Sequence, residues 1–321
     1  MSSVKFRNFF IRYSRVLILV ILCAVFALTT KTFWTLSNLS MIVLKQAPVS
    51  IILAIIMTQT IILGGIDLSM GSAVAMLSSI MGMTLQATFR TFPNLSPWLG
   101  IAVALGLGAC IGLANGFLIA KVKIPTFIAT YSLQWILKGI ALILLGGKQI
   151  FDLGTNFRNM FIGYDGTLFA IAAVVALVMN FVLKKTIFGH QVYATGTNQA
   201  AAKLSGIRTE RIIMTVFLIN GLLVGLATIM NTAYVGTAEP ITGDSFPLNA
   251  VAATLIGGTS IGTVNGKVSN AIVGVLIFLV LTNGMVMIGI PAVWQQCVIG
   301  AVIIAAVVLE RGMEKISVET V

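Results

Sequence analysis

The residues of this chain that could do chemistry are few, and they lie in or beside long apolar runs. The clearest constellation is Gly-Gly-Ile-Asp-Leu-Ser-Met-Gly-Ser at residues 64–72. Asp67 and Ser69 are placed to accept hydrogen bonds from the first backbone N–H groups of a following helix, which is a capping role. Because a carboxylate at membrane depth is costly unless it is paired, the alternative is that this turn lines a pathway or transmits a gating motion.

A second constellation is Ile-Gly-Gly-Thr-Ser-Ile-Gly-Thr-Val-Asn-Gly-Lys at residues 256–267. It predicts an apolar helix that gives way to flexible backbone before another helix starts. Irregular backbone at membrane depth is tolerated where protein buries it or water reaches it, so these residues could form the edge of a cavity. The alternative is close helix packing at Gly257, Gly258 and Gly262, since small residues let neighbouring helices approach.

A third constellation lies in the loop 184–211, between two apolar runs. Asn198 is placed to cap a short helix over residues 199–204, and Gly206 then ends it. A two-turn helix has little stability alone, so the pattern favours a segment that docks on a partner. The alternative is a solvated loop without a partner.

The remaining reactive side chains do not assemble into a recognisable catalytic or metal site. Cys23, Cys110 and Cys297 lie in apolar runs without paired or metal-ligand spacing, and His190 is the single histidine. The apolar runs show no paired carboxylates or Ser/His arrangement, and no Gly-x-x-x-x-Gly-Lys-Ser/Thr loop could hold a nucleotide phosphate. The sequence therefore predicts no catalytic residues, no metal and no cofactor, and any ATP-driven work needs a separate chain.

The elements that must position these residues follow from composition. The chain is 58% hydrophobic and 9% charged, whereas soluble domains carry roughly 25% charged residues. A helix that crosses a bilayer needs about 20 predominantly apolar residues. The net charge of +11 would suggest nucleic acid only if the basic residues gathered on a soluble face, and here they punctuate the apolar runs instead.

We therefore predict an all-α, polytopic membrane protein of about ten transmembrane helices, forming a single transmembrane domain over residues 1–321. The predicted spans are 16–36, 48–65, 70–89, 98–120, 125–146, 166–183, 212–232, 248–262, 268–289 and 291–309. Placing both termini in the cytoplasm puts fourteen of the twenty basic residues on the cytoplasmic side and five on the opposite side, and leaves Lys138 within the predicted span 125–146. This asymmetry is the one expected from the positive-inside rule.

The combined motifs resemble the ribose-type permeases of ABC importers over nearly the whole chain. The resemblance rests on residues 64–72, Pro-Thr-Phe-Ile-Ala-Thr at 125–130, the segment 196–206, and Ile-Gly-Gly-Thr-Ser at 256–260. It implies a second permease copy, as a homodimer or pseudodimer, a cytoplasmic ABC ATPase and an extracytoplasmic solute-binding protein. It also implies a coupling loop received by the ATPase, for which the candidates are Asn198, Ala201, Lys203 and Gly206.

We therefore predict the membrane subunit of a binding-protein-dependent importer of a monosaccharide or similar polar solute, in the bacterial inner membrane and surrounded by lipid. The alternative is a secondary transporter driven by an ion gradient, although Asp67 is the single carboxylate close to membrane depth. The pathway or gating candidates are Asp67, Ser69, Gln59, Asn115, Asn249 and Asn283. The sequence does not identify the solute, because in this architecture selectivity resides largely in the external binding protein.

Overall fold

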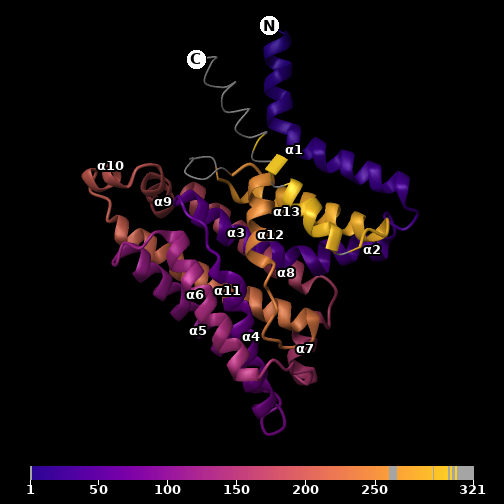
Figure 1. Cartoon of the computed structure of the whole chain (residues 1–321), viewed down its shortest axis with the longest axis vertical. Helices are drawn as coiled ribbons and strands as arrows, with labels where there is room; N and C mark the ends of the chain where they lie inside the picture. Colours follow the sequence, from indigo (N-terminus) through magenta and orange to yellow (C-terminus); the bar gives the residue numbers. More distant parts are fainter. Residues whose placement is uncertain (1, 260–265, 292, 303, 306–307, 309–321) are drawn as a thin grey trace.

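The computed structural model describes residues 2–259, 266–291, 293–302, 304, 305 and 308, and this part of the chain is built of helices (Figure 1). Their order is α1 (Ser2–Thr29), α2 (Leu36–Ser40), the π-helical turn η1 (Met41–Gln46), α3 (Ala47–Ile62), α4 (Ser69–Thr88), α5 (Ser96–Ala120), α6 (Thr126–Leu145), α7 (Thr155–Ile162), α8 (Thr167–Lys185), α9 (Ile187–Thr197), α10 (Gln199–Leu204), α11 (Thr209–Val235), α12 (Phe246–Ile256) and α13 (Val268–Met287).

Seven helices in the described part of the chain are long and apolar enough to cross a bilayer. They are Leu36–Ile62, Ser69–Thr88, Ser96–Ala120, Thr126–Leu145, Thr167–Lys185, Thr209–Val235 and Val268–Met287. Shorter apolar helices, Arg15–Thr29, Phe246–Ile256 and Val293–Val302, lie within the remaining predicted segments or overlap them. The all-α, polytopic class is thus confirmed, and seven of the predicted spans have spanning length.

The largest difference from the predicted segments is at the start of the second span. The sequence places its beginning near residue 48, whereas α2, η1 and α3 continue without a break from Leu36. The polar Asn38 in this early part is buried: it donates to the carbonyl oxygen of Phe33 (3.0 Å) and exchanges two amide hydrogen bonds with Asn283 of α13 (3.1 and 2.9 Å). The polarity of Asn38 suggests a loop, but Asn283, far away in the chain, provides the hydrogen bonds that allow it to lie within a buried helix.

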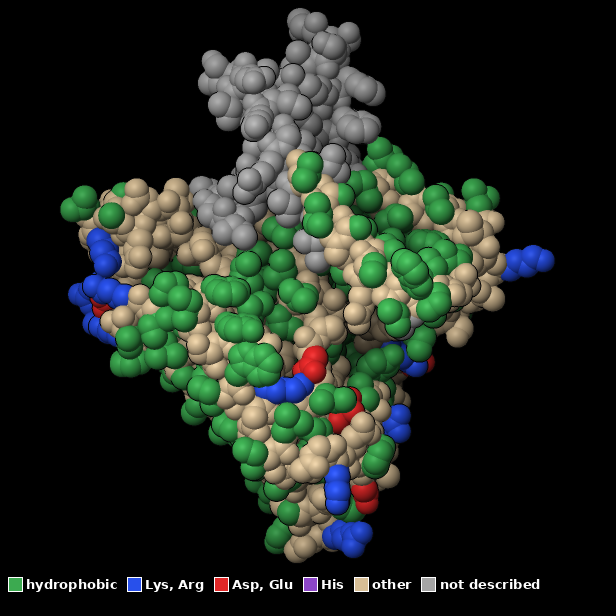
Figure 2. Space-filling view, in the orientation of Figure 1, with side chains coloured by type: hydrophobic (Ala, Val, Ile, Leu, Met, Phe, Trp, Pro, Cys, Tyr) green, Lys and Arg blue, Asp and Glu red, His purple; other side chains and the backbone are tan. Residues whose placement is uncertain are grey.

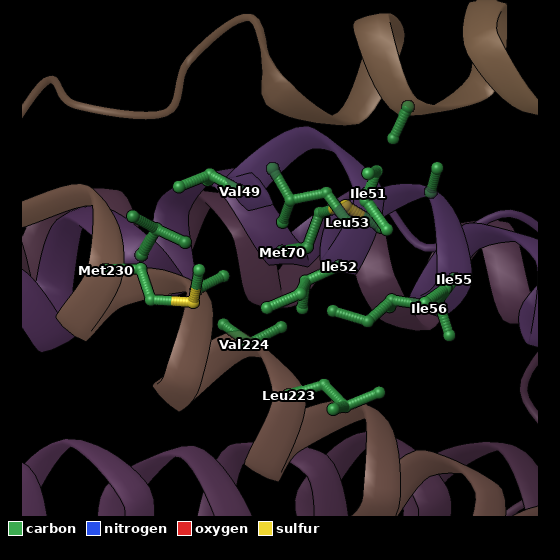
Figure 3. Close-up of a cluster of buried hydrophobic side chains, with 14 of the residues drawn as sticks. Val49, Ile51, Ile52, Leu53, Ile55, Ile56, Met70, Leu223, Val224 and Met230 are labelled. Atoms are coloured by element: carbon green, nitrogen blue, oxygen red, sulfur yellow. The ribbon is translucent and has the colours of Figure 1, made fainter. Parts of the chain in front are cut away.

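The core of the molecule surrounds α3. Every residue of this helix except Ser50 is buried, and the helix packs against α8, α11, α12 and α13. A helix that is apolar on all sides is expected in the centre of a bundle. Figure 3 shows its isoleucines, among them Ile52 and Ile56, beside Met70 of α4 and Leu223 of α11.

The most extensive helix–helix contact in the described part of the chain is between α5 and α11, which run side by side (Figure 1). Gly108, Gly112 and Gly116 recur every four residues on α5, and the first two face Gly221 and Gly225 of α11. A β-carbon on Gly108 would lie 2.5 Å from the carbonyl oxygen of Gly221, and one on Gly112 would lie 3.0 Å from the Gly221 Cα atom. The two backbones are therefore in direct contact, which is a common way for helices to associate in lipid. We call this contact the glycine seam.

Charged side chains avoid much of the surface shown in Figure 2. They gather at the corner where α10 lies and α11 begins and toward the lower end of the view, with a small group of opposite charges near its centre and one basic side chain at the right edge. At that corner Lys121, directly after α5, pairs with Glu210 at the start of α11 (2.7 Å). The surface around these charged groups is largely apolar, as expected of a protein embedded in a membrane.

Candidate functional site

The turn between α3 and α4 is closed by Asp67. Its Oδ1 atom accepts hydrogen bonds from the backbone N–H of Ser69 (2.9 Å) and from the Ser69 hydroxyl (2.6 Å). Both residues are buried. Asp67 thus accepts from one backbone N–H at the start of α4, as the capping alternative expects, although the N-cap position is Leu68, which has no side-chain cap bond, and Ser69 donates its hydroxyl instead of accepting. A further role of Asp67 and Ser69 in a pathway or in gating stays a prediction.

Two further helices hold this turn in place. Asn115 of α5 donates from Nδ2 to the Ser69 hydroxyl oxygen (2.8 Å). The Thr130 hydroxyl of α6 lies 3.1 Å from the carbonyl oxygen of Ile66 and accepts a bond from the backbone N–H of Leu68 (3.2 Å). The turn thus connects four helices, and we call Asp67, Ser69, Asn115 and Thr130 the turn network.

A substitution pair separates the capping role of Asp67 from a role of its charge. We expect Asp67→Asn to keep solute uptake and thermal stability near the wild-type level, because the amide oxygen can accept the same two bonds. Asp67→Ala should lower stability by about 1–3 kcal/mol, since it leaves buried donors without an acceptor. Thermal unfolding in detergent and uptake assays measure the two effects. Loss of uptake in a normally folded Asp67→Asn protein would show that the charge itself is needed.

The predicted pathway residues do not form one group. Gln59 of α3 is fully buried, and neither of its amide atoms has a hydrogen-bond partner among the described residues. Asn115 belongs to the turn network, and Asn283 is engaged with Asn38. Asn249 of α12 is partly exposed and lines a cavity.

This cavity has a volume of about 750 Å³ and lies between α3, α12, α13 and the segment 293–302. Aliphatic and aromatic side chains form much of its wall, with polar groups between them. The polar lining residues are Ser50, Asp244, Ser245, Asn249, Thr282, Gln295 and Gln296. Asp67, Ser69, Gln59, Asn115 and Asn283 are not among the described residues that line it. An apolar cavity with a few hydroxyl, amide and carboxylate groups is the usual form of a small-molecule site.

An ion pair stands at the edge of the cavity. Lys138, within α6, contacts both carboxylate oxygens of Asp244, in the loop between α11 and α12. The Lys138 side chain is 17% exposed and that of Asp244 57% exposed. Lys138 stood out in the sequence as a basic residue within a predicted span, but its partner is far away in the chain and no local pattern identifies it.

The predicted short helix in the loop 184–211 is confirmed. α10 spans Gln199–Leu204, the Asn198 side chain accepts a hydrogen bond from the Ala201 backbone N–H (3.0 Å), and Gly206 has a left-handed φ of 82°. Ala201 and Lys203 are exposed, as are Asn198 and Gly206. The neighbouring Leu204 is 91% exposed. Docking of this helix on a partner protein stays a prediction.

The preceding helix α9, which the sequence did not reveal, connects α10 to the core. Gly196 lies against the backbone of Ile62 and Leu63 at the end of α3, and a β-carbon there would overlap the Ile62 carbonyl oxygen. The Tyr193 hydroxyl donates to the carbonyl oxygen of Gly266 (2.5 Å), just before α13. Burial raises the pKa of Tyr193.

The segment 256–267 supports the packing alternative where it is described. A β-carbon on Gly257 would overlap the carbonyl oxygen of Asn270 in α13, and the Arg15 guanidinium lies against Gly258, whose φ is +76°. Gly262 falls in 260–265, outside the described residues. Two of the three glycines thus allow close contacts between separate elements.

Comparison with known proteins decides the family. Residues 39–307 match the family described as branched-chain amino acid transport system / permease component. The chain belongs to this family. The permease is 33% identical over 305 residues to the ribose import permease protein RbsC of Escherichia coli K12, with 91% of each chain covered. It is 36% identical over 276 residues to RbsC of Bacillus subtilis 168 (84% and 83% covered) and 30% identical over 319 residues to the D-allose transport system permease protein AlsC of Escherichia coli K12 (97% and 95% covered).

Family membership fixes the general role of the chain. It is a permease, a transport subunit and not an enzyme, in the multi-pass class of bacterial inner-membrane proteins. The matched relatives are named for sugars although the family description names amino acids. The family therefore does not by itself identify the solute. No solved structure matches the chain.

Proposed function

We propose that the permease forms the membrane pathway of an ATP-driven, binding-protein-dependent importer of a monosaccharide. The solute class rests on the relatives of this chain, which are named as permeases for ribose (RbsC) and D-allose (AlsC). Their alignments cover 91% and 97% of this chain. The cavity beside α12 agrees with it, because hydroxyl, amide and carboxylate groups among apolar walls suit a small solute with many hydroxyls.

Reconstitution tests this proposal. Proteoliposomes that contain the permease, its ABC ATPase and its binding protein should accumulate radiolabelled D-ribose or D-allose when ATP is supplied. Omission of the ATPase should abolish accumulation. Uptake that persists without the ATPase and collapses with an uncoupler would contradict the proposal and favour an ion-driven transporter.

The proposed topology is ten spans in a single membrane domain with both termini in the cytoplasm. The sorting of basic residues in the sequence supports it. The three short helices Arg15–Thr29, Phe246–Ile256 and Val293–Val302 would then join the seven longer helices to give ten spans. Reporter fusions after residues 165 and 208 should report opposite sides of the membrane, and equal signals would contradict the topology.

A second permease copy is proposed to complete the pathway. The cavity is partly open, and exposed apolar side chains lie near it, among them Leu248 of α12, which is 61% exposed. A pathway for a polar solute cannot remain open to hydrocarbon. Cross-linking between copies through a cysteine at position 248 would support the dimer, and a single permease per complex in native mass spectrometry would contradict it.

The coupling role of α10 leads to a prediction for Ala201. We expect Ala201→Trp to abolish ATP-dependent uptake. The bulky indole would lie between α10 and the ATPase surface on which α10 is proposed to dock, and would keep the two apart. Membrane insertion should remain, since the Ala201 side chain is exposed. Uptake assays and co-purification of the ATPase measure the effect. Ala200→Ser, a small change on the same exposed helix, is the control, and normal uptake with normal ATPase binding in Ala201→Trp would refute the coupling role.

A further inference from the structure

Helix α6 exposes two stripes of different chemistry. The first, which we call the aromatic stripe, combines rings with polar side chains at spacings of three and four residues: Phe127, Tyr131, Gln134, Trp135 and Lys138. The second, the aliphatic stripe, follows the same spacing on the opposite side of the helix: Ile136, Ile140, Ile143 and Leu144. Residues three and four apart lie on the same side of a helix, so each set forms a continuous surface.

The aromatic stripe is a ladder of rings. Phe127 and Tyr131 are stacked, with ring centroids 5.7 Å apart, and Tyr131 meets Trp135 edge to face at 6.2 Å. The three side chains are 55%, 42% and 61% exposed, so they pack against one another but are uncovered on their outer side. Gln134 lies half-buried beside them.

The aromatic stripe ends at the ion pair. Lys138 lies one turn beyond Trp135 and binds Asp244, which lines the cavity. A charged pair on a spanning helix is expected to face water or protein, because hydrocarbon cannot solvate it. The side of α6 that holds the aliphatic stripe carries no charge: Ile143 is 82% exposed, and Ser132, one turn before the stripe, adds only a hydroxyl. Charge therefore distinguishes the two exposed sides of α6, and the aliphatic side suits a surface that faces lipid.

We propose that the aromatic stripe lines the solute route between the cavity and the end of α6 near Thr126, and that its rings hold the sugar in transit. The proposal rests on the proposed function. The face of an aromatic ring is negative, so it attracts the partly positive C–H groups on one side of a sugar ring. Gln134 and the ion pair offer hydrogen bonds to the hydroxyl groups. Successive rings provide equivalent weak sites, so a solute can move along them without being trapped.

Labelling of single cysteines tests which stripe faces water. In the assembled importer in proteoliposomes, with Cys23, Cys110 and Cys297 replaced by serine, we expect a charged, membrane-impermeant methanethiosulfonate to label Tyr131→Cys and Trp135→Cys. Labelling of the matched aliphatic-stripe variants, Ile136→Cys and Ile143→Cys, should be at least about tenfold slower, because the reagent does not enter hydrocarbon. Equal rates on both stripes, or slow labelling of both aromatic positions, would overturn the proposal.

Transport of radiolabelled D-ribose or D-allose tests the stacking. Trp135→Leu should reduce the uptake rate about tenfold and Trp135→Phe by less, because phenylalanine keeps a ring face. Binding of the sugar by the external protein should not change, and Ile136→Leu should transport normally. Equal uptake by Trp135→Leu and wild type would refute the stacking role. If wild-type proteoliposomes take up no sugar, the proposed solute class fails, while the labelling pattern still decides whether the stripe faces water.

Discussion

Replacement of Gly112 by alanine is expected to destabilise the permease more than any other single methyl addition in α5. The new β-carbon would overlap the carbonyl oxygen of Phe217, and the backbone of Gly221 lies directly behind it. Neither is the end of a flexible side chain that could turn away, so α5 and α11 would have to separate along the glycine seam. We expect a loss of about 3 kcal/mol, at the upper end of the range for overpacked cores, measured as a lower unfolding temperature in detergent.

Gly106→Ala is the matched control. Gly106 is also a helical residue of α5, but no described atom lies within 4 Å of the position that its β-carbon would take. This variant should keep or slightly raise stability, since alanine favours helix more than glycine does. Equal stability of the two variants would show that the seam relaxes without cost, contrary to the contact that the structure describes.

A second large effect is expected at Gly196, but on transport and not on assembly. In Gly196→Ala the new methyl group would overlap the Ile62 carbonyl oxygen, which pushes α9 away from the end of α3. α10 and its Asn198 cap lie beyond this contact and should remain able to bind the ATPase. We therefore expect the complex to assemble and hydrolyse ATP while uptake falls at least about tenfold, because a motion of α10 would no longer reach α3.

Uptake and ATP hydrolysis measured on the same proteoliposomes separate these outcomes. Thr197→Ala is the control, because Thr197 is the next residue and its side chain is exposed. It should transport at a near-normal rate. Normal uptake in Gly196→Ala would show that the contact between Gly196 and α3 is not needed to transmit the motion of α10. Loss of ATPase binding would show that the substitution impairs assembly of the complex instead.

The parts of the fold that local chemistry determines could be predicted from the sequence. The apolar runs located the spanning helices. Asn198 and Gly206 predicted the two ends of α10, because a capping side chain and a glycine with positive φ each end a helix within one turn of their own position. The start of the Leu36–Ile62 helix could not be predicted, since Asn38 is satisfied by Asn283 of α13. Long-range partners of this kind are not visible in a local pattern.

The candidate site follows the same division. The bond from the Ser69 backbone to Asp67 is local and was predicted, whereas the contacts of Asn115 and Thr130 with that turn depend on how α5 and α6 pack. Lys138 was visible as a charge within a span, but Asp244 needed the fold. The four-residue glycine spacing on α5 is a sequence signal for close packing, and it would have identified the seam.

The glycine seam also limits how the permease can move. Helices that touch through their backbones leave no layer of side chains that could re-pack, so α5 and α11 should act as one rigid body throughout a transport cycle. Rearrangement between the outward and inward states then falls to elements outside this pair, among them the loop that carries Asp244. The α5–α11 pair would then be the fixed part of the permease against which the cavity opens and closes.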